Sequence, residues 1–175
     1  MLEKFRSLAI GLCLLAIAAG LAAYFMVQMG SGEKLFGGGS GTLPPVEFES
    51  LTYDGTEPGY LLCPDDLCTT ATANGPAPRF EVNARTLRLA LADYTDNMPT
   101  IRTFRFDPAA NQFDFTERLP GESFPAVLTV RILDKGPYAS ELVIYSRKPV
   151  GDNEPGEHEK RVNRWINLLT SRLGS

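Results

Sequence analysis

The pattern of apolar and polar positions opens with an almost wholly apolar run. From Leu8 to Met29 the only strongly polar side chain is Gln28. A helix of this length rises about 33 Å, enough to cross a hydrocarbon core of roughly 30 Å. The run predicts a transmembrane anchor at residues 8–29 after a short cytoplasmic lead, residues 1–7.

Flanking charge predicts the orientation of this anchor. Lys4 and Arg6 precede the run, whereas Lys34 after it is balanced by Glu33. The positive-inside rule keeps the N-terminus in the cytoplasm and exports the rest. We therefore expect a single-pass protein of the inner membrane with a periplasmic C-terminal domain.

Two other interpretations of the run stay open. A cleaved secretory signal would end in small residues, and Ala22 and Ala23 form a poor cleavage site. A lipoprotein would use Cys13, but the bulky Leu12 before it disfavours that modification. The run exceeds the usual apolar core of a signal peptide, so an uncleaved anchor is favoured.

A glycine-rich segment follows the anchor. Residues 30–45 contain six glycines and two serines, the composition of a flexible linker. The remaining residues, 46–175, are enough for one domain with a buried core.

Periodicity predicts a helix and a hairpin in the first half of this domain. Apolar residues at spacings of three and four indicate a helix capped by Asn83 and running to about Asp96. Alternation on both sides of the loop 107–111 indicates a half-buried hairpin. We expect its aromatic side chains in the core, namely Phe104, Phe106, Phe113 and Phe115.

Two longer strands and a final helix complete the pattern. Residues 124–133 and 140–147 alternate, and Pro125 indicates that the first of these strands begins there or lies at a sheet edge. From Pro155 to Leu173 acidic residues gather early and arginines late, as the helix dipole favours. The predicted fold is α+β, an antiparallel four-stranded meander with two helices packed on one face.

Charge disfavours one class of partner. The chain has 17 basic and 21 acidic residues, of which three basic and two acidic ones precede residue 46, so residues 46–175 carry a net charge of −5. Such a surface repels nucleic acid. We expect no nucleic-acid partner.

Cysteine usage agrees with export. Cys63 and Cys68 form a close pair, which can be a structural disulfide, a pair of exchanging thiols or half of a metal site. Zinc needs four ligands, and His158 is the only histidine. A structural disulfide is favoured, and we expect no metal and no cofactor.

Any histidine-based chemistry must use His158. Neighbouring acidic residues of the last helix would raise its pKa if they lie close. A serine triad can be drawn with Ser146 or Ser140, but no G-x-S-x-G elbow accompanies them. We therefore assign no catalytic residue and expect a capping or semi-buried role for His158.

Basic residues concentrate in one stretch of the domain, at Arg147, Lys148, Lys160, Arg161 and Arg164. Arginine forks bind carboxylates and phosphates, so this stretch is a candidate site for an anionic small ligand. Alternatively, Arg147 and Arg161 fasten the last helix to its strand by pairing with nearby acids, namely Asp152, Glu154 or Glu157.

The order of several motifs resembles a known family. CPDDLC, a helix, FPAVLTVRIL and the stretch from Leu142 to Leu169 follow one another as in the bacterial and plastid family called domain of unknown function 1499. The resemblance spans roughly residues 60–170. It implies a fold but no reaction, because the family has no assigned activity.

This chain departs from the family pattern at several points. Four residues rather than five separate its cysteines, and Ala126 and Val127 stand where the family has an acidic pair. The segment from Arg147 to Arg161 is two residues longer, and His158 stands where asparagine is usual. Because apolar residues cannot replace the acidic pair chemically, an ancestral site would be altered here.

These observations favour a membrane-tethered, non-catalytic domain that binds a protein partner or a small ligand, as an accessory to an envelope complex. One alternative is an enzyme of unrecognised type. Its cleft would lie around Tyr145, Arg147, His158 and Arg161. These four residues and Lys148 are the ligand-binding candidates. Another is a carrier of lipids or hydrophobes with a cavity between helices and sheet, lined by Phe104, Phe115 and Trp165.

Overall fold

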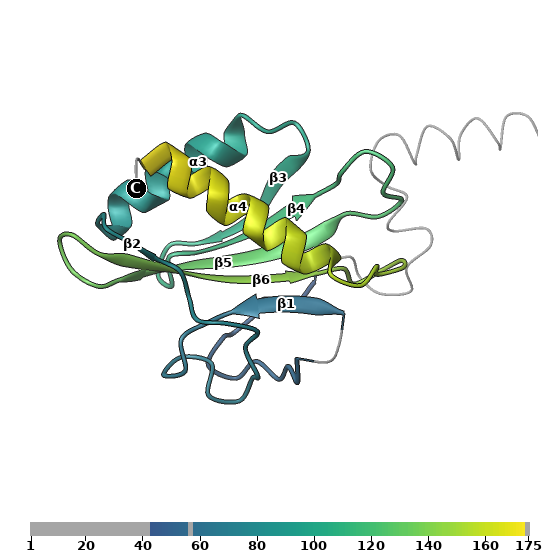
Figure 1. The fold of residues 1–175 in the computed structure, drawn as a ribbon, viewed down its shortest axis with the longest axis horizontal. Coiled ribbons are helices and arrows are strands. Elements are labelled where there is room, and N and C mark those ends of the chain that lie inside the picture. Colours follow the sequence, from purple (N-terminus) through teal and green to yellow (C-terminus); the bar gives the residue numbers. More distant parts are fainter. Residues whose placement is uncertain (1–42, 56–57, 174–175) are drawn as a thin grey trace, which may run out of the picture. The chain divides into compact units, whose positions relative to one another are not determined.

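A computed structural model describes residues 43–55 and 58–173 (Figure 1). The predicted anchor, residues 8–29, lies outside these ranges. Within them, no helix combines the length and apolarity that a membrane span needs. The elements, in chain order, are β1 (Gly59–Leu62), β2 (Arg79–Phe80), α3 (Ala84–Asp96), β3 (Ile101–Asp107), β4 (Gln112–Glu117), β5 (Ala126–Asp134), β6 (Ser140–Arg147) and α4 (Glu157–Leu173).

The strands form one antiparallel sheet. Its order is β1-β6-β5-β4-β3, and β2 also pairs with β6. The predicted meander of four strands, β3 to β6, is confirmed. Pro125 marks the start of β5 rather than a sheet edge, because β5 lies between β4 and β6.

Both predicted helices form, with the expected signals at their ends. The side chain of Asn83 caps α3 by accepting a hydrogen bond from the backbone N–H of Thr86 at 2.9 Å. The helix α4 begins at Glu157, directly after Gly156. Gly156 has a φ of +73°, which glycine adopts without strain and other residues rarely adopt.

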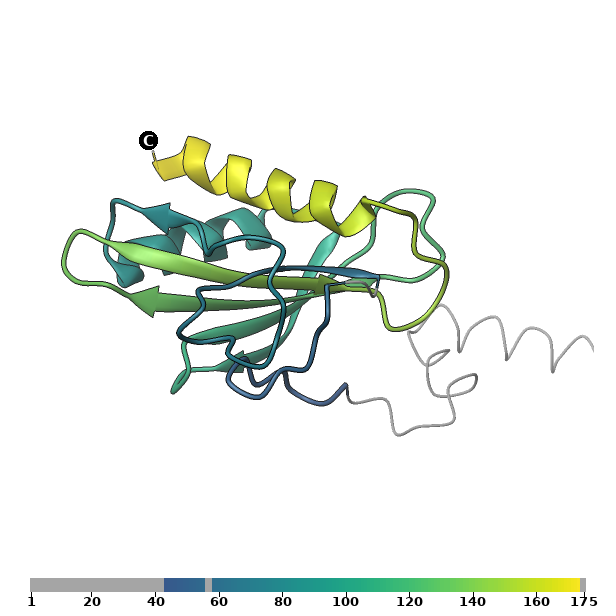
Figure 2. The same cartoon turned by 60° about the horizontal axis from the view of Figure 1, so that its bottom comes forward.

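The main core lies between these helices and one face of the sheet (Figure 2). Trp165 of α4 is at its centre, with its ring 5.2 Å from that of Tyr94 and 5.3 Å from that of Phe115. Two of the predicted core residues are not buried, since Phe104 and Phe106 are 43% and 46% exposed. They lie on β3, the edge strand, and Phe104 sits at an irregularity of the pairing with β4.

A second layer covers part of the opposite face of the sheet and was not predicted. Residues from the segments 46–55 and 63–77 pack there against side chains of β6, with Phe48 and Tyr53 on Val143 and Tyr145. Backbone hydrogen bonds such as that from Asn74 N to Leu61 O, 2.8 Å, tie this layer to β1. The segment has too few regular elements for hydrophobic periodicity to reveal it.

Cys63 and Cys68 form a disulfide within this layer, as favoured from the sequence. We expect replacement of both cysteines by serine to lower the free energy of unfolding by about 2 kcal/mol, because the unfolded chain regains the entropy of the open loop. Urea unfolding measures this difference. Chemical reduction of the wild type serves as the control and should cause the same loss; equal stability of oxidised and reduced protein would contradict the prediction.

Candidate functional site

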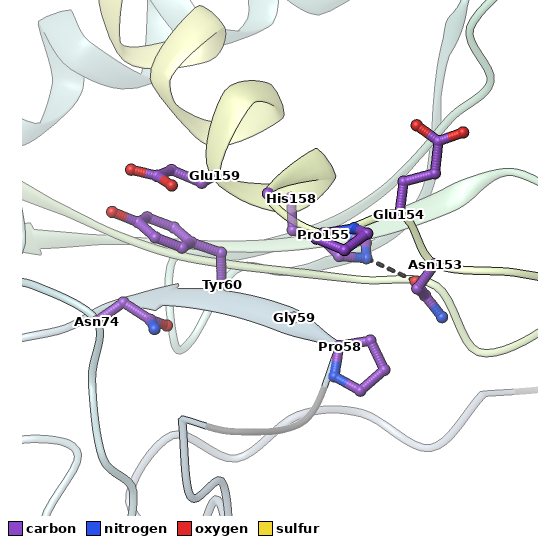
Figure 3. A pocket seen from close by; sticks show the side chains of 10 residues that line it. Pro58, Gly59, Tyr60, Asn74, Asn153, Glu154, Pro155, His158 and Glu159 are labelled. Atoms are coloured by element: carbon purple, nitrogen blue, oxygen red, sulfur yellow. Dashed lines mark hydrogen bonds between the residues drawn. The ribbon is translucent and has the colours of Figure 1, made fainter.

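The start of α4 and the loop before it place His158 inside the domain. The side chain is 3% exposed and is held from both sides. Its Nδ1 lies 2.8 Å from Ser146 Oγ on β6, and its Nε2 lies 2.8 Å from Asn153 Oδ1 in the loop. Figure 3 shows the second of these contacts.

The two contacts assign one tautomer to His158. An amide oxygen only accepts, so Nε2 carries the proton and donates to Asn153, while Nδ1 accepts from the hydroxyl of Ser146. Burial lowers the pKa of His158, with further lowering by Arg161 and Lys148. The expected rise is wrong, because burial outweighs the nearby carboxylates of Glu157 and Glu122, which do act to raise the pKa.

The chain of contacts Ser146–His158–Asn153 resembles a catalytic triad, with Ser146 as nucleophile, His158 as base and Asn153 as the group that orients the base. However, Ser146 is fully buried on β6, so no substrate carbonyl can reach its hydroxyl. In serine hydrolases the nucleophile bonds Nε2 and the orienting group bonds Nδ1, which is the reverse of this arrangement. These contacts fasten α4 to β6.

A buried cluster of charges adjoins His158. Arg161 is 1% exposed and donates to Glu117 on β4 at 2.9 Å, to Glu157 at 2.8 Å and to Glu122. Lys148 contacts Glu157 at 2.7 Å, and Arg164 reaches Glu117 at 2.8 Å. The described part of the cluster therefore balances three cations against three carboxylates. Of the predicted pairs, the described residues show Arg161 with Glu157, which lies within α4 itself. The contacts of Arg161 that fasten the helix go instead to Glu117 on β4 and Glu122 in the following loop.

The cluster shifts the pKa of Glu157 strongly. Burial alone would raise this pKa, but hydrogen bonds from Lys148 and Arg161 outweigh it and lower the pKa to about 2. Glu157 therefore stabilises the fold above about pH 4.5, and this contribution is lost as the pH falls towards 2. Neutral His158 contributes in the same direction at higher pH. Its contribution is present above about pH 6.5 and is lost as the pH falls through the lowered pKa.

We therefore expect the stability of the protein to fall in two stages on acidification. The variant His158→Asn, which cannot titrate, should lose the upper stage, so that its free energy of unfolding changes less between pH 7 and pH 5 than that of the wild type. Urea unfolding across this range measures the difference. Parallel pH profiles of the two proteins would contradict the assignment.

A pocket of about 410 Å³ opens beside His158, between β1 and the start of α4 (Figure 3). Tyr60 and Glu159 lie side by side in it. Burial raises the pKa of Tyr60, and the charge of Glu159 raises it further. The lining residues are Pro58, Gly59, Tyr60, Asn74, Asn153, Glu154, Pro155, Gly156, His158 and Glu159.

Polar and apolar groups both line this pocket. Its lining contains two carboxylates, those of Glu154 and Glu159, and neither is ion paired within the part of the chain that the structure describes. No lysine or arginine belongs to the lining. Within the described ranges, no group of three or more His, Cys, Asp or Glu side chains is arranged to hold a metal ion.

The predicted ligand-binding residues separate into two groups. Lys148, His158 and Arg161 lie on the face of the sheet that the helices cover. Tyr145 and Arg147 lie on the opposite face, where the guanidinium carbon of Arg147 is 5.4 Å from the centre of the Tyr145 ring. Side chains of adjacent strand residues point to opposite faces, so these residues do not share one cleft.

Sequence reasoning missed most of the pocket lining. Tyr60 lies on β1, a strand of only four residues, and Asn74 lies in the irregular layer below it. Asn153 belongs to the segment before α4, which is longer than in the family that the sequence resembles. This extra length was the one sequence signal that pointed to the pocket. The carrier alternative expected a cavity lined by Phe104, Phe115 and Trp165. The rings of Phe115 and Trp165 are instead in contact with each other, and Phe104 is exposed on the edge strand.

Comparison with known proteins gives no family. No family model matches the chain, and no curated protein matches it, so the resemblance to domain of unknown function 1499 stays a prediction. An uncharacterised protein from Bacillus thuringiensis is similar in structure over 57% of this chain and 96% of its own, with 8% identity and a TM-score of 0.42.

Two further solved structures are similar to part of the chain. The di-domain ARO/CYC protein BexL of the BE-7585A biosynthetic pathway matches 55% of this chain and 42% of its own, with 12% identity and a TM-score of 0.37. A START superfamily protein from Mycobacterium smegmatis matches 56% and 94%, with 10% identity and a TM-score of 0.36. At these TM-scores and identities, the likenesses assign neither a family nor a function.

Proposed function

We propose that this protein is a non-catalytic, small-ligand-binding domain and that its ligand occupies the pocket between β1 and the start of α4. The observation that carries the proposal is the pocket itself, about 410 Å³ in volume and backed by a histidine held by two hydrogen bonds. Preformed concave sites of this size with a few fixed polar groups are typical of small-molecule binding.

The lining favours a ligand that carries a positive charge. The carboxylate of Glu159 would attract an amino or guanidino group, and the ring of Tyr60 beside it offers a face for the same cation (Figure 3). The lining offers no cation to an anionic ligand. A small organic amine is therefore the ligand class that this pocket fits best.

The same proposal includes the cellular setting. Residues 8–29 would tether the domain to the inner membrane on its periplasmic side, where an envelope complex would be its neighbour. The disulfide Cys63–Cys68 agrees with an oxidising compartment. Membrane fractionation followed by protease treatment of spheroplasts tests this setting, and loss of the anchor or protection of the domain would overturn it.

Titration of the full chain, in non-ionic detergent, with putrescine and L-arginine tests the ligand class. We expect the variant Glu159→Gln to weaken binding of the amine about tenfold, because it removes one charge-assisted hydrogen bond from the site. Glu47→Gln is the matched control, since Glu47 is exposed and does not line the pocket. Equal affinity of Glu159→Gln and wild type, or no binding of either amine, would overturn the assignment.

A further inference from the structure

Arg147 is the last residue of β6, and its side chain lies on the face of the sheet opposite α3 and α4. It pairs in register with Gly59 on β1 and with Val127 on β5, so it lies well inside the sheet rather than at an edge. Ser146, the residue before it, points to the other face and contacts His158. Arg147 is therefore separated from the pocket by the sheet.

The guanidinium of Arg147 stacks on an aromatic ring and has no anionic partner. It lies 5.4 Å from the centre of the Tyr145 ring, and no ion pair or hydrogen bond joins its side chain to another residue in the described part of the chain. Most partly buried arginines are paired, because an unpaired charge is costly to remove from water. Burial lowers the pKa of Arg147 accordingly.

The carboxylate whose charge acts on Arg147, that of Asp114, already has other partners. Asp114 on β4 accepts a hydrogen bond from Thr129 at 2.7 Å through one oxygen, and its other oxygen lies 3.2 Å from Arg105. Arg105 is close enough to Arg147 for its charge to lower the pKa of Arg147, whereas Asp114 acts in the opposite direction. Of the two cations, Arg105 is the one that forms an ion pair with this buried carboxylate.

We propose that the face of the sheet around Arg147 binds a small oxyanion, a carboxylate or phosphate group, with Arg147 as its bidentate donor and Arg105 as a second positive charge. The ring of Tyr145 lies under the guanidinium, and the planar fork of arginine N–H groups matches a planar oxyanion. The site goes beyond the amine pocket and lies on the other side of the sheet. It would hold the anionic ligand expected from the sequence with two of the predicted residues, Tyr145 and Arg147, and with Arg105, which was not predicted.

The experiment is a calorimetric titration of the full chain, in non-ionic detergent, with inorganic phosphate and separately with citrate. We expect at least one of them to bind the wild type, and Arg147→Gln to weaken that binding at least tenfold. Arg147→Lys keeps the charge but loses the fork, and should recover only part of the affinity. The ratio of phosphate to citrate affinity identifies the oxyanion.

Arg88→Gln is the control for general charge effects, because Arg88 is exposed on α3. It should leave the affinity unchanged. Equal losses in Arg88→Gln and Arg147→Gln, full recovery by lysine, or failure of both anions to bind the wild type would each overturn the proposal. Putrescine titration of Arg147→Gln separates this site from the pocket, since amine binding should be unaffected.

Discussion

Replacing Arg161 by alanine is expected to lower the free energy of unfolding by about 3–5 kcal/mol, because the change leaves buried carboxylates without their shared cation. Arg161 contacts Glu117, Glu122 and Glu157 at once, and Glu117 is almost fully buried with it. Lys148 would still reach Glu157, but among the described residues the one other cation in contact with Glu117 is the partly exposed Arg164. Urea unfolding of the variant measures the loss.

Arg164→Ala is the matched control for this prediction. Its side chain is 37% exposed and contacts the same carboxylate, so its removal should cost about 1 kcal/mol or less. The double variant Arg161→Met with Glu117→Leu removes both members of the most buried pair and should recover part of the loss. If Arg161→Ala and Arg164→Ala were equally destabilising, the loss could not arise from an uncompensated buried charge.

The variant Trp165→Ala is expected to lose about 3–5 kcal/mol of unfolding free energy for a different reason, namely the cavity that it leaves in the main core. Trp165 is fully buried and packs between Tyr94 and Phe115 with ring-centre distances of 5.2 and 5.3 Å. Chemical unfolding monitored by circular dichroism measures the loss without relying on tryptophan fluorescence.

Trp165→Phe separates packing from hydrogen bonding. The indole Nε1 of Trp165 is buried and has no hydrogen-bond partner among the described residues, so phenylalanine removes an unpaired donor while keeping most of the apolar volume. We expect this variant to lose clearly less than Trp165→Ala. Losses of the same size in the two variants would show that the indole contributes more than its volume.

The fold was predictable wherever a segment is long enough to repeat its own period. Alternation gave β6 at residues 140–147, and the spacing of Leu87, Leu91 and Tyr94 gave α3 with its cap at Asn83. The strand β1 has only four residues and β2 only two, so neither could show a period. Both pair with β6 through backbone contacts that are distant in sequence.

The candidate site was predictable only in part, for a related reason. Glu157, four residues before Arg161, was named as a partner from the sequence, whereas Glu117 and Glu122 reach Arg161 only through the packing of α4 on β4. The pKa of His158 was predicted with the wrong sign. Its acidic neighbours are visible in the sequence, but its burial is not.

The helix α4 presents one stripe of charged residues and one stripe of apolar residues, and together they limit insertions and deletions within the helix. Residues 157, 161 and 164 meet the carboxylates and Lys148, while residues 162, 165 and 169 meet the apolar core. One inserted or deleted residue rotates everything after it by about 100°, so both stripes would lose register together. Gains and losses of residues in evolution should therefore accumulate in the segment 148–156, which precedes the helix and forms one wall of the pocket.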